Sequence, residues 1–273
     1  MIPSNIPIFA RQMTLTFYKY QATGNDFVMI DNRAQIFYKN NTKLVAQLCD
    51  RRFGIGADGL ILLENTPNYD FRMVYFNADG NESTMCGNGG RCIVAFAKQL
   101  GIVEQHTTFL AIDGPHDARI EGINIYLKMQ SVNEIHIQQD YTTLDTGSPH
   151  YVTLKSDIDT LDVKTEGKKI RCSSLFLDEG INVNFLKQIH QNTFAIRTYE
   201  RGVEDETLSC GTGATAAAIA MHHAKQTDSE KVILETRGGQ LQVTFNFDGK
   251  IYNNVWLSGS ATSVFEGIIS TTN

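Results

Sequence analysis

One short pattern occurs twice in this sequence, and the repetition constrains the fold more than any other feature. Each copy places a cysteine before Gly-x-Gly, once in residues 84–90 and once in residues 208–214. A run typical of a helix follows each copy, at residues 91–100 and 215–224. We therefore expect two similar halves, each with a cysteine at the start of a helix.

Chemistry gives this pair of cysteines a common interpretation. A cysteine at a helix N-terminus meets unpaired backbone N–H groups and the positive end of the macrodipole, which are expected to stabilise its thiolate. The flanking glycines let a carboxylate approach those N–H groups without obstruction by a Cβ atom. A thiolate and a thiol on opposite sides of a carbon acid can take a proton from one face and return one to the other. The pattern indicates that Cys86 and Cys210 exchange protons with a substrate and need no cofactor.

Length and charge narrow the class of protein. The 273 residues suffice for two domains of ordinary size, and the net charge of −6 argues against a nucleic-acid partner. No apolar run approaches the roughly 18 residues that span a bilayer. The start of the chain lacks the basic and apolar regions of a signal peptide. We therefore expect a cytoplasmic protein that does not associate with membranes.

The distribution of patterned segments predicts an α+β fold. Strands are expected at residues 27–31, 60–63, 71–76, 181–186 and 193–199, a helix at 42–52, and a hairpin at 231–247 that turns at Gly238 and Gly239. Strands dominate, with one central helix in each half. The expected architecture is two pseudo-symmetric domains, each a curled, mostly antiparallel sheet around its helix, with the active site in the cleft between them.

The expected domain boundary lies after residue 130. An N-terminal lobe of residues 1–130 would carry Cys86, and a C-terminal lobe of residues 131–261 would carry Cys210. Residues 262–273 are expected to return to the first lobe. Residues 1–13 are interpreted as an extension before the first strand, with Met13 as an alternative start.

Other polar motifs have competing interpretations. The odd number of cysteines forms no disulfide framework, and Cys49, Cys92 and Cys172 are interpreted as small buried side chains. The separation of Cys86 from Cys92 does not match zinc-binding pairs, so no metal is expected. The glycine-rich segment 54–59 lacks both the G-x-G-x-x-G spacing and a P-loop lysine. His222 and His223 are expected to be exposed in a helix tail.

The sequence allows both a structural and a functional interpretation of two further polar groups. His150 is either a satisfied structural histidine or a group that tunes a nearby thiol. Glu200 and Arg201 are either a solvated pair at a strand end or a carboxylate and a guanidinium that point into the cleft.

Several motifs, in one order from about residue 14 to the end, resemble the diaminopimelate epimerase family. They occupy residues 24–27, 51–59, 76–80, 85–92, 149–150, 200–202 and 210–213. The resemblance implies a PLP-independent epimerase that converts LL-diaminopimelate to the meso form, on the route to lysine and peptidoglycan precursors. It also implies a homodimer with a small-molecule substrate and no cofactor.

The resemblance assigns roles to individual residues. Cys86 and Cys210 would be the catalytic acid and base, with His150 and Glu200 modulating their pKa values. The implied substrate-binding residues are Asn25, Asn77, Gly87, Asn88, Ser148, Asn182, Glu200, Arg201, Gly211 and Thr212. Phe265 falls where the family places an aromatic residue at the dimer interface.

The sequence also departs from the family pattern. Ser148 stands where the family usually has Asn, and Gly59 where some members have Gln. The segment between Glu200 and Cys210 is one residue longer than the commonest form. These departures concern recognition of the distal end of the substrate and leave both thiols in place.

Two alternative functions remain. A proline or hydroxyproline racemase would resemble Met-Cys-Gly-His-Gly in the first motif, where this chain has Asn88, and Asp-Arg-Ser-Pro-Cys in the second, where it has residues 207–210. The other alternative is a non-catalytic protein that binds amino acids or senses redox state through its thiols.

Overall fold

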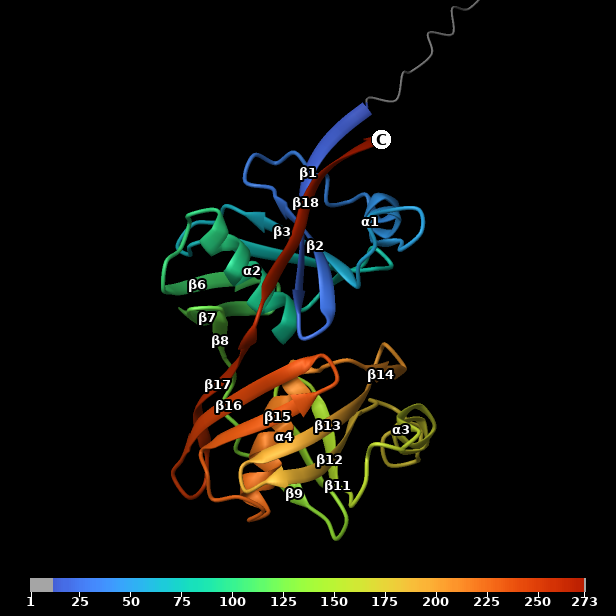
Figure 1. Cartoon of the computed structure of the whole chain (residues 1–273), viewed down its shortest axis with the longest axis vertical. Coiled ribbons are helices and arrows are strands. Elements are labelled where there is room, and N and C mark those ends of the chain that lie inside the picture. Colours follow the sequence, from blue (N-terminus) through green and yellow to red (C-terminus); the bar gives the residue numbers. More distant parts are fainter. Residues whose placement is uncertain (1–11, 273) are drawn as a thin grey trace, which may run out of the picture.

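The computed structural model describes residues 12–272 and shows a mixed α+β fold (Figure 1). Within this range the chain forms four helices and eighteen strands. The expected extension lies mostly outside the described residues, but Gln12 and Met13 already belong to β1 (Gln12–Ala22). Their backbones pair with Thr272 and Thr271 of β18 (Thr262–Thr272). The first strand therefore starts two residues earlier than expected.

The first part of the chain forms one group of elements at the upper end of Figure 1. After β1 these are β2 (Asn25–Asp31), α1 (Thr42–Cys49), β3 (Gly59–Glu64), β4 (Arg72–Asn77), β5 (Glu82–Ser83), α2 (Gly87–Gln99), β6 (His106–Ala111), β7 (Gly114–Glu121) and β8 (Asn124–Lys128). Most pairings are antiparallel, but β2 with β3 and β4 with β6 run parallel.

The second part forms the lower group of elements. These are β9 (Ile135–Ile137), β10 (Thr142–Asp145), β11 (Pro149–Leu154), α3 (Val163–Arg171), β12 (Asn182–His190), β13 (Thr193–Glu200), β14 (Asp205–Thr207), α4 (Gly211–His223), β15 (Lys231–Thr236), β16 (Gly239–Phe247) and β17 (Tyr252–Ser260). The expected hairpin is confirmed in β15 and β16, which pair around Arg237 and Gly238.

Two helices are buried among these strands. Helix α2 contacts β1, β2, β3, β7 and β8 and buries Ile93, Phe96 and Ala97 completely. Helix α4 contacts β10 to β13 and β15 to β17. All residues from Gly213 to His222 on α4 are buried, as expected for a helix that is apolar on every side. The small side chains of this helix allow strands to pack closely around it.

The last two strands connect the two groups. β17 pairs with β16 on one side and with β8 on the other, and β18 pairs with β1. The chain therefore ends beside its first described strand, as Figure 1 shows. The division of the chain at residues 130 and 261 stays a prediction.

Several expectations were wrong in detail. Helix α1 ends at Cys49 instead of residue 52, because Asp50 is extended and its carboxylate accepts the N–H groups of Arg52 and Phe53. Helix α3 was not expected. Its N-terminus is capped by Asp162, and its last turn carries Lys168, Lys169 and Arg171, which suit the negative end of the dipole.

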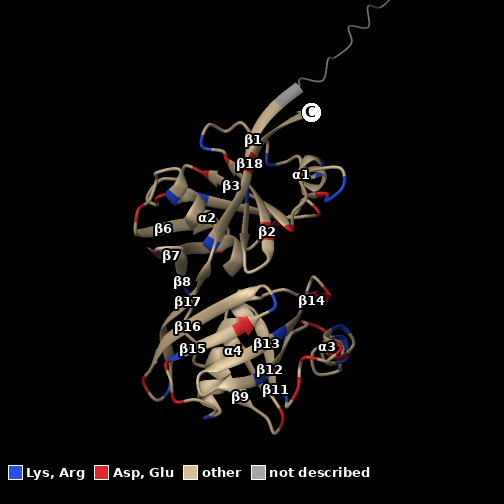
Figure 2. Ribbon diagram, viewed as in Figure 1, with Lys and Arg blue, Asp and Glu red and all other residues tan. Residues whose placement is uncertain are grey.

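Two side chains also differ from their expected exposure. His222 is 7% exposed, because its Nδ1 meets the hydroxyl of Tyr252 at 2.9 Å within an aromatic cluster. Cys172 is exposed after the end of α3, whereas Cys49 and Cys92 are buried as expected. None of the helices within residues 12–272 is long and apolar enough to cross a membrane. Acidic and basic residues are interspersed over both groups of elements (Figure 2).

Candidate active site

The N-termini of α2 and α4 meet through their first glycines. A Cβ atom added to Gly211 would lie 3.3 Å from the Cα of Gly87 and 2.9 Å from Cδ2 of Leu257. A Cβ added to Gly87 would lie 3.5 Å from the Cα of Gly211. The backbones therefore touch where any side chain would separate the helices. This contact brings the two predicted cysteine motifs together.

Each cysteine is the N-cap of its helix, as the sequence predicted. The Sγ of Cys86 accepts a hydrogen bond of 3.2 Å from the backbone N–H of Gly89. The Sγ of Cys210 lies 3.5 Å from Oγ1 of Thr212. Cys86 is half-buried and Cys210 is buried, so both sulfurs have little contact with water.

The backbone N–H groups at the helix ends lower the thiol pKa values, as expected, but burial has a larger effect in the opposite direction. Burial raises the pKa of the Cys86 thiol to about 11, although the N–H of Gly89 and the charge of Arg91 act in the opposite direction. Burial, followed by the negative charge of Glu200, raises the pKa of Cys210 well above its ordinary value. Desolvation of the thiolate outweighs the helix dipole, and both thiols hold their protons at neutral pH.

Glu200 lies at the end of β13 and acts on the thiols. Burial raises the pKa of its carboxyl group, while contacts with the side chains of Thr207 and Cys210 lower it by less. Its negative charge raises the pKa of both Cys86 and Cys210. The carboxyl group of Glu200 thus contacts Cys210 and is not a solvated surface group.

Asn88 joins the two halves at the site. Its Nδ2 donates to the backbone oxygen and the Oγ of Ser209, at 3.2 and 3.1 Å, and to Oδ1 of Asn25 at 3.3 Å. Its Oδ1 accepts from Arg91 at 2.8 Å and from Thr23 at 3.3 Å. Since Ser209 precedes Cys210, this side chain ties the start of α2 to the segment that leads into α4.

Arg91 is a buried cation that the sequence did not single out. It is completely buried, and its guanidinium donates to three neutral oxygens, on Gly87, Asn88 and Thr23. Its Nε has no hydrogen-bond partner within the described residues. Burial lowers the pKa of Arg91 to about 10, which leaves it positively charged at neutral pH. A positive charge therefore stands behind the start of α2.

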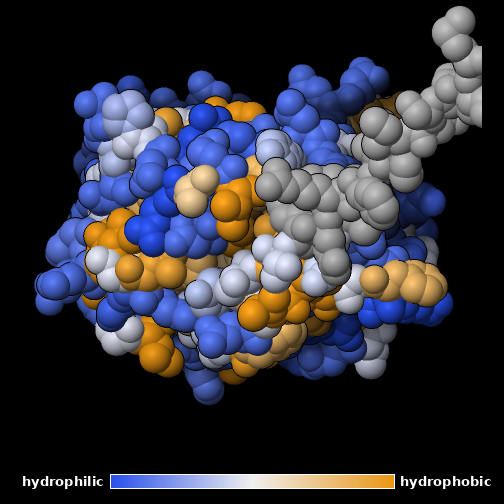
Figure 3. Space-filling model, turned by 90° about the horizontal axis from the view of Figure 1, so that it is seen from above, coloured by the Kyte–Doolittle hydropathy of each residue, from blue (hydrophilic) through white to orange (hydrophobic). Residues whose placement is uncertain are grey.

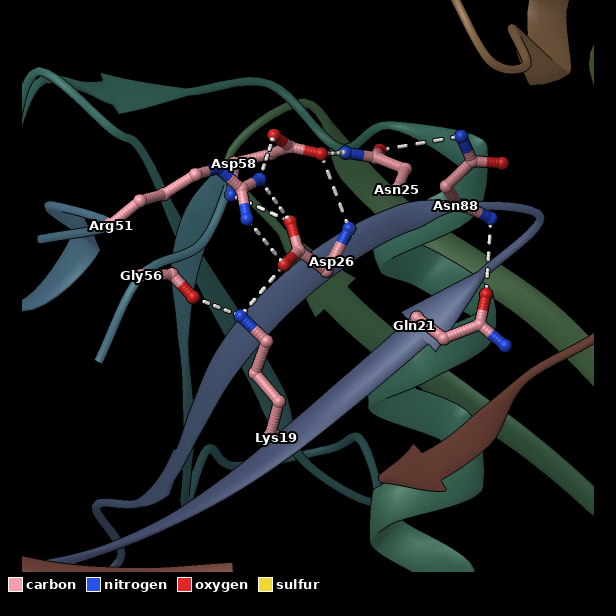
Figure 4. A network of polar contacts seen from close by, with 9 residues as sticks. Lys19, Gln21, Asn25, Asp26, Arg51, Gly56, Asp58 and Asn88 are labelled. Atoms are coloured by element: carbon pink, nitrogen blue, oxygen red, sulfur yellow. Dashed lines mark hydrogen bonds and ion pairs between the residues drawn. The ribbon is translucent and has the colours of Figure 1, made fainter. Parts of the chain in front are cut away.

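An ionic network fixes Asn25 (Figure 4). The Nδ2 of Asn25 donates to Oδ2 of Asp58 at 2.6 Å, and Arg51 pairs with both Asp58 and Asp26 at 2.7 Å. Buried Lys19 pairs with Asp26 at 2.7 Å and donates to the carbonyl of Gly56. The glycine-rich segment 54–59 thus turns Asn25 so that its amide oxygen faces Asn88.

A second polar cluster surrounds His150, which is completely buried. Its Nε2 lies 3.0 Å from Oγ of Ser148, and its Nδ1 lies 3.1 Å from Nδ2 of Asn184. Burial, helped by the charge of Arg201, lowers the pKa of His150 to about 3, so the ring is neutral. His150 is linked to the Cys210 end of the site through Ser148. The Oγ of Ser148 lies 3.3 Å from Oγ1 of Thr212.

The other predicted residues lie around this cluster or away from it. Asn182 donates to Ser148 at 3.1 Å and accepts the backbone N–H of Arg201 at 2.8 Å. The guanidinium of Arg201 donates to the carbonyl of Glu179. Asn77 is exposed at the end of β4, in register with Gly59. Phe265 lies on β18, remote in the chain from both cysteine motifs.

Sequence reasoning missed Arg91, Asn184, Lys19 and the acidic pair Asp26 and Asp58 as parts of the site. Arg91, Asp26 and Asp58 lie inside the motifs of the family, but the sequence alone does not show what their charges contact. Asn184 is two residues beyond Asn182 on the same strand, and this spacing places both on one face. Within residues 12–272, no three His, Cys, Asp or Glu side chains are grouped as a metal ion would need.

Solved structures of other proteins share this fold. A Bacillus anthracis phenazine biosynthesis protein of the PhzF family superposes with a TM-score of 0.76 at 14% identity, over 94% of this chain and 99% of that chain. A hydroxyproline epimerase from Agrobacterium vitis, with bound trans-4-hydroxy-L-proline, gives 0.66 at 11% identity, over 95% and 93% of the two chains. The chain has the fold shared by PhzF proteins and proline racemases.

Sequence comparison identifies the family within this class. The model of the diaminopimelate epimerase family matches residues 17–132 and 142–263. The diaminopimelate epimerase of Flavobacterium psychrophilum is 58% identical over 256 residues, which cover 93% of this chain and 100% of the relative. That of Chlorobaculum tepidum is 42% identical, over 90% and 98% of the two chains. The chain belongs to the diaminopimelate epimerase family and is an isomerase.

Proposed function

We propose that this isomerase interconverts LL- and meso-diaminopimelate with Cys86 and Cys210 as its two proton carriers. The observation that carries the proposal is the contact of Gly87 with Gly211, which brings two cysteine-capped helix ends together. Membership of the family supports the substrate. The reaction belongs to the biosynthesis of lysine and peptidoglycan precursors, and the cytoplasm is its expected location.

The proposed step moves two protons and needs no cofactor. A thiolate takes the α-proton, so the C–H bond breaks and an S–H bond forms. The opposite thiol then gives its proton to the other face of the same carbon and becomes the thiolate. Between these events the electron pair is spread into the α-carboxylate. The first N–H groups of α2 and α4, at Gly87, Asn88, Gly211 and Thr212, have no acceptor within their own helix and are suited to hold that carboxylate.

One thiol must lose its proton before the cycle begins, because burial keeps both protonated. Glu200 is the proposed acceptor for Cys210, since the two side chains are in contact and burial has raised the pKa of the carboxyl group. Arg91 and the N–H of Gly89 stabilise negative charge at Cys86. Asn25, Asn77, Ser148, Asn182 and Arg201 are the proposed contacts for the remaining polar groups of the substrate.

We further propose that the chain consists of two pseudo-symmetric lobes, divided after residue 130, with the site in the cleft between them. Helices α2 and α4 have the same length of 13 residues, the same cysteine cap and the same position among strands. Residues 262–273 would belong to the first lobe, which the pairing of β18 with β1 supports.

A homodimer is proposed through exposed apolar side chains of β18. Val264, Phe265 and Ile268 are 56%, 48% and 71% exposed, although all three are apolar. Phe265 packs edge to face on Phe17 of β1, with ring centroids 5.9 Å apart. Hydrophobic surface appears at this end of the molecule among hydrophilic residues (Figure 3). Replacing Phe265 by Arg should shift the sedimentation coefficient toward a monomer, and an unchanged value would place the interface elsewhere.

The test of the proposed function is isotope incorporation in D2O with purified protein and no added cofactor. The thiol that returns the proton exchanges with solvent before substrate binds. The inverted product should therefore gain deuterium at the α-carbon during early turnover, while recovered substrate gains little. Equal early labelling of substrate and product would point to one base serving both faces and would refute the two-thiol mechanism.

Matched cysteine variants separate the proposed roles. Cys86→Ala and Cys210→Ala should each abolish epimerisation, since one face then lacks its proton carrier. Cys172→Ala, at an exposed cysteine, should retain activity. Turnover of proline isomers but not of diaminopimelate would favour the racemase alternative.

A further inference from the structure

A chain of hydrogen bonds runs from Asn184 to Cys210 through three side chains, those of His150, Ser148 and Thr212. Backbone groups determine which atom donates at each link. Asn184 donates from Nδ2 to the carbonyl oxygen of Tyr151 at 3.0 Å, and its Oδ1 accepts from Thr198 at 2.9 Å. A carbonyl oxygen can only accept, so Nδ2 must be the atom on that side. The second hydrogen of Nδ2 points at Nδ1 of His150, 3.1 Å away. Nδ1 is therefore an acceptor, and the hydrogen of the neutral ring resides on Nε2.

The next link, at Ser148, is oriented by the same reasoning. Nε2 of His150 lies 3.0 Å from Oγ of Ser148, and with its hydrogen it is the donor. Asn182 also donates to this oxygen, because its Oδ1 is occupied by the N–H of Arg201, which can only donate. Ser148 Oγ thus receives two hydrogen bonds, and its own hydrogen is free for Oγ1 of Thr212 at 3.3 Å.

The last link reaches the sulfur. With Oγ1 accepting from Ser148, the hydroxyl hydrogen of Thr212 is directed to Sγ of Cys210, 3.5 Å away. We propose that Asn184 is a positioning residue that sets the direction of this hydrogen-bond chain, so that Thr212 donates to the Cys210 sulfur and favours its thiolate. This inference rests on the proposed function of Cys210 and adds a residue that contacts no reacting atom.

The direction of the chain matters because a donor and an acceptor act oppositely on a thiol. A hydroxyl that donates to sulfur favours the thiolate, and one that accepts from S–H favours the thiol. In the reverse direction, Ser148 would donate to His150 and Thr212 to Ser148, leaving Cys210 without a donor from this side. The neutral state of His150 is consistent with one hydrogen on the ring.

The first experiment is NMR of the ligand-free protein labelled with 15N-histidine at neutral pH. The signals of His150, assigned by their loss in His150→Gln, should show an unprotonated Nδ1 and a protonated Nε2. In Asn184→Asp the new carboxylate can only accept, so Nδ1 should gain the hydrogen. Burial of the ring, helped by the charge of Arg201, disfavours a cationic imidazole, and Nε2 should therefore lose its hydrogen. A protonated Nδ1 in the native protein, or an unchanged ring in Asn184→Asp, would overturn the proposal.

The second experiment measures the alkylation rate of each cysteine by iodoacetamide with mass-spectrometric mapping. Because the rate follows the thiolate fraction, loss of the donor should slow Cys210 about tenfold in both Asn184→Asp and Thr212→Val. Cys86 in the same molecules should keep its rate and report an intact fold. Unchanged alkylation of Cys210 in Asn184→Asp would show that Asn184 does not set the direction.

Thr198→Val is the matched control. It removes the partner of Oδ1 but leaves both hydrogens of the Asn184 amide paired. The ring of His150 and the alkylation of Cys210 should therefore match the native protein, and a change in either would assign the effect to general loosening of the cluster. Neither experiment uses substrate, so a native protein without epimerase activity would refute the proposed function and leave this inference standing.

Discussion

Replacing Gly211 by alanine tests the contact on which the active site is built. The backbone of Gly211 is not in the left-handed region, so alanine is conformationally acceptable there. Its Cβ would lie 2.9 Å from Cδ2 of Leu257 and 3.3 Å from Cα of Gly87. Carbon atoms prefer separations of about 3.5–4.0 Å. Leu257 is completely buried, so it cannot turn away into solvent.

The expected change in stability follows from two opposing effects. Forcing a methyl group into a packed core costs about 1–3 kcal/mol, and alanine is up to about 1 kcal/mol better than glycine in a helix. Gly211→Ala should therefore lower the free energy of unfolding by about 1–2 kcal/mol. Leu257→Val shortens the obstructing side chain and should by itself cost about 1 kcal/mol. In that background Gly211→Ala should be nearly neutral.

Urea unfolding of the four proteins in this double-mutant cycle measures the coupling. Additivity within about 0.5 kcal/mol would show that Leu257 does not limit the space at Gly211. Epimerase activity gives a second readout, because the added Cβ still lies against Gly87 in the double variant and still separates the two helix ends. The cost of Gly211→Ala to stability should disappear in the Leu257→Val background, while activity stays low. Full activity of Gly211→Ala would refute the argument that this close contact sets the spacing of the thiols.

Three further predictions concern ionisable groups. Arg201→Lys, which loses the planar guanidinium, should lower kcat/KM for diaminopimelate at least tenfold, whereas exposed Lys155→Arg should not; equal kinetics would remove Arg201 from the site. His150 has a pKa of about 3 in the folded protein against about 6.5 unfolded, so its stabilisation is full above pH 6.5 and falls with pH. Between pH 7 and 5 the native protein should lose about 2 kcal/mol more unfolding free energy than His150→Gln, as urea titrations would show. Arg91→Met should raise the pKa of Cys86, since the cation favours the thiolate, and an unshifted pH profile of Cys86 alkylation would contradict this.

Many of the helices and strands could be predicted because the local sequence patterns agree with the fold. The repeated cysteine and glycine pattern marks both buried helices, and Cys86 and Cys210 cap them as predicted. Alternating apolar residues predicted several of the strands around these helices. Helix α3 was not predicted because most of its residues are polar and few apolar residues mark the helical period. Its N-cap Asp162 and the basic residues of its last turn are nevertheless signals of a helix. His222 was misjudged because its burial depends on Tyr252, which is 30 residues away.

The direction of the thiol pKa shifts could not be predicted from the pattern. A helix N-terminus favours the thiolate of a cysteine, but burial of the sulfur away from water can outweigh that effect. At this site Cys210 is buried, and both the burial and the adjacent carboxylate of Glu200 destabilise its thiolate. The sequence shows the helix end but not how much solvent the folded chain leaves there. That balance is a property of the packed structure.

The polar chain behind Cys210 illustrates what register adds to sequence. β11 and β12 are parallel, with His150 opposite Asn182, and residues 155–181 separate them in the chain. No local signal sets the pairing of strands so far apart. Once that register is given, Asn184 falls on the same face as Asn182, and the backbone groups of Tyr151 and Arg201 determine how each amide is turned. The direction of the hydrogen bonds to the thiol is thus a consequence of strand pairing, because fixed donors and acceptors of the backbone orient side chains that could otherwise turn either way.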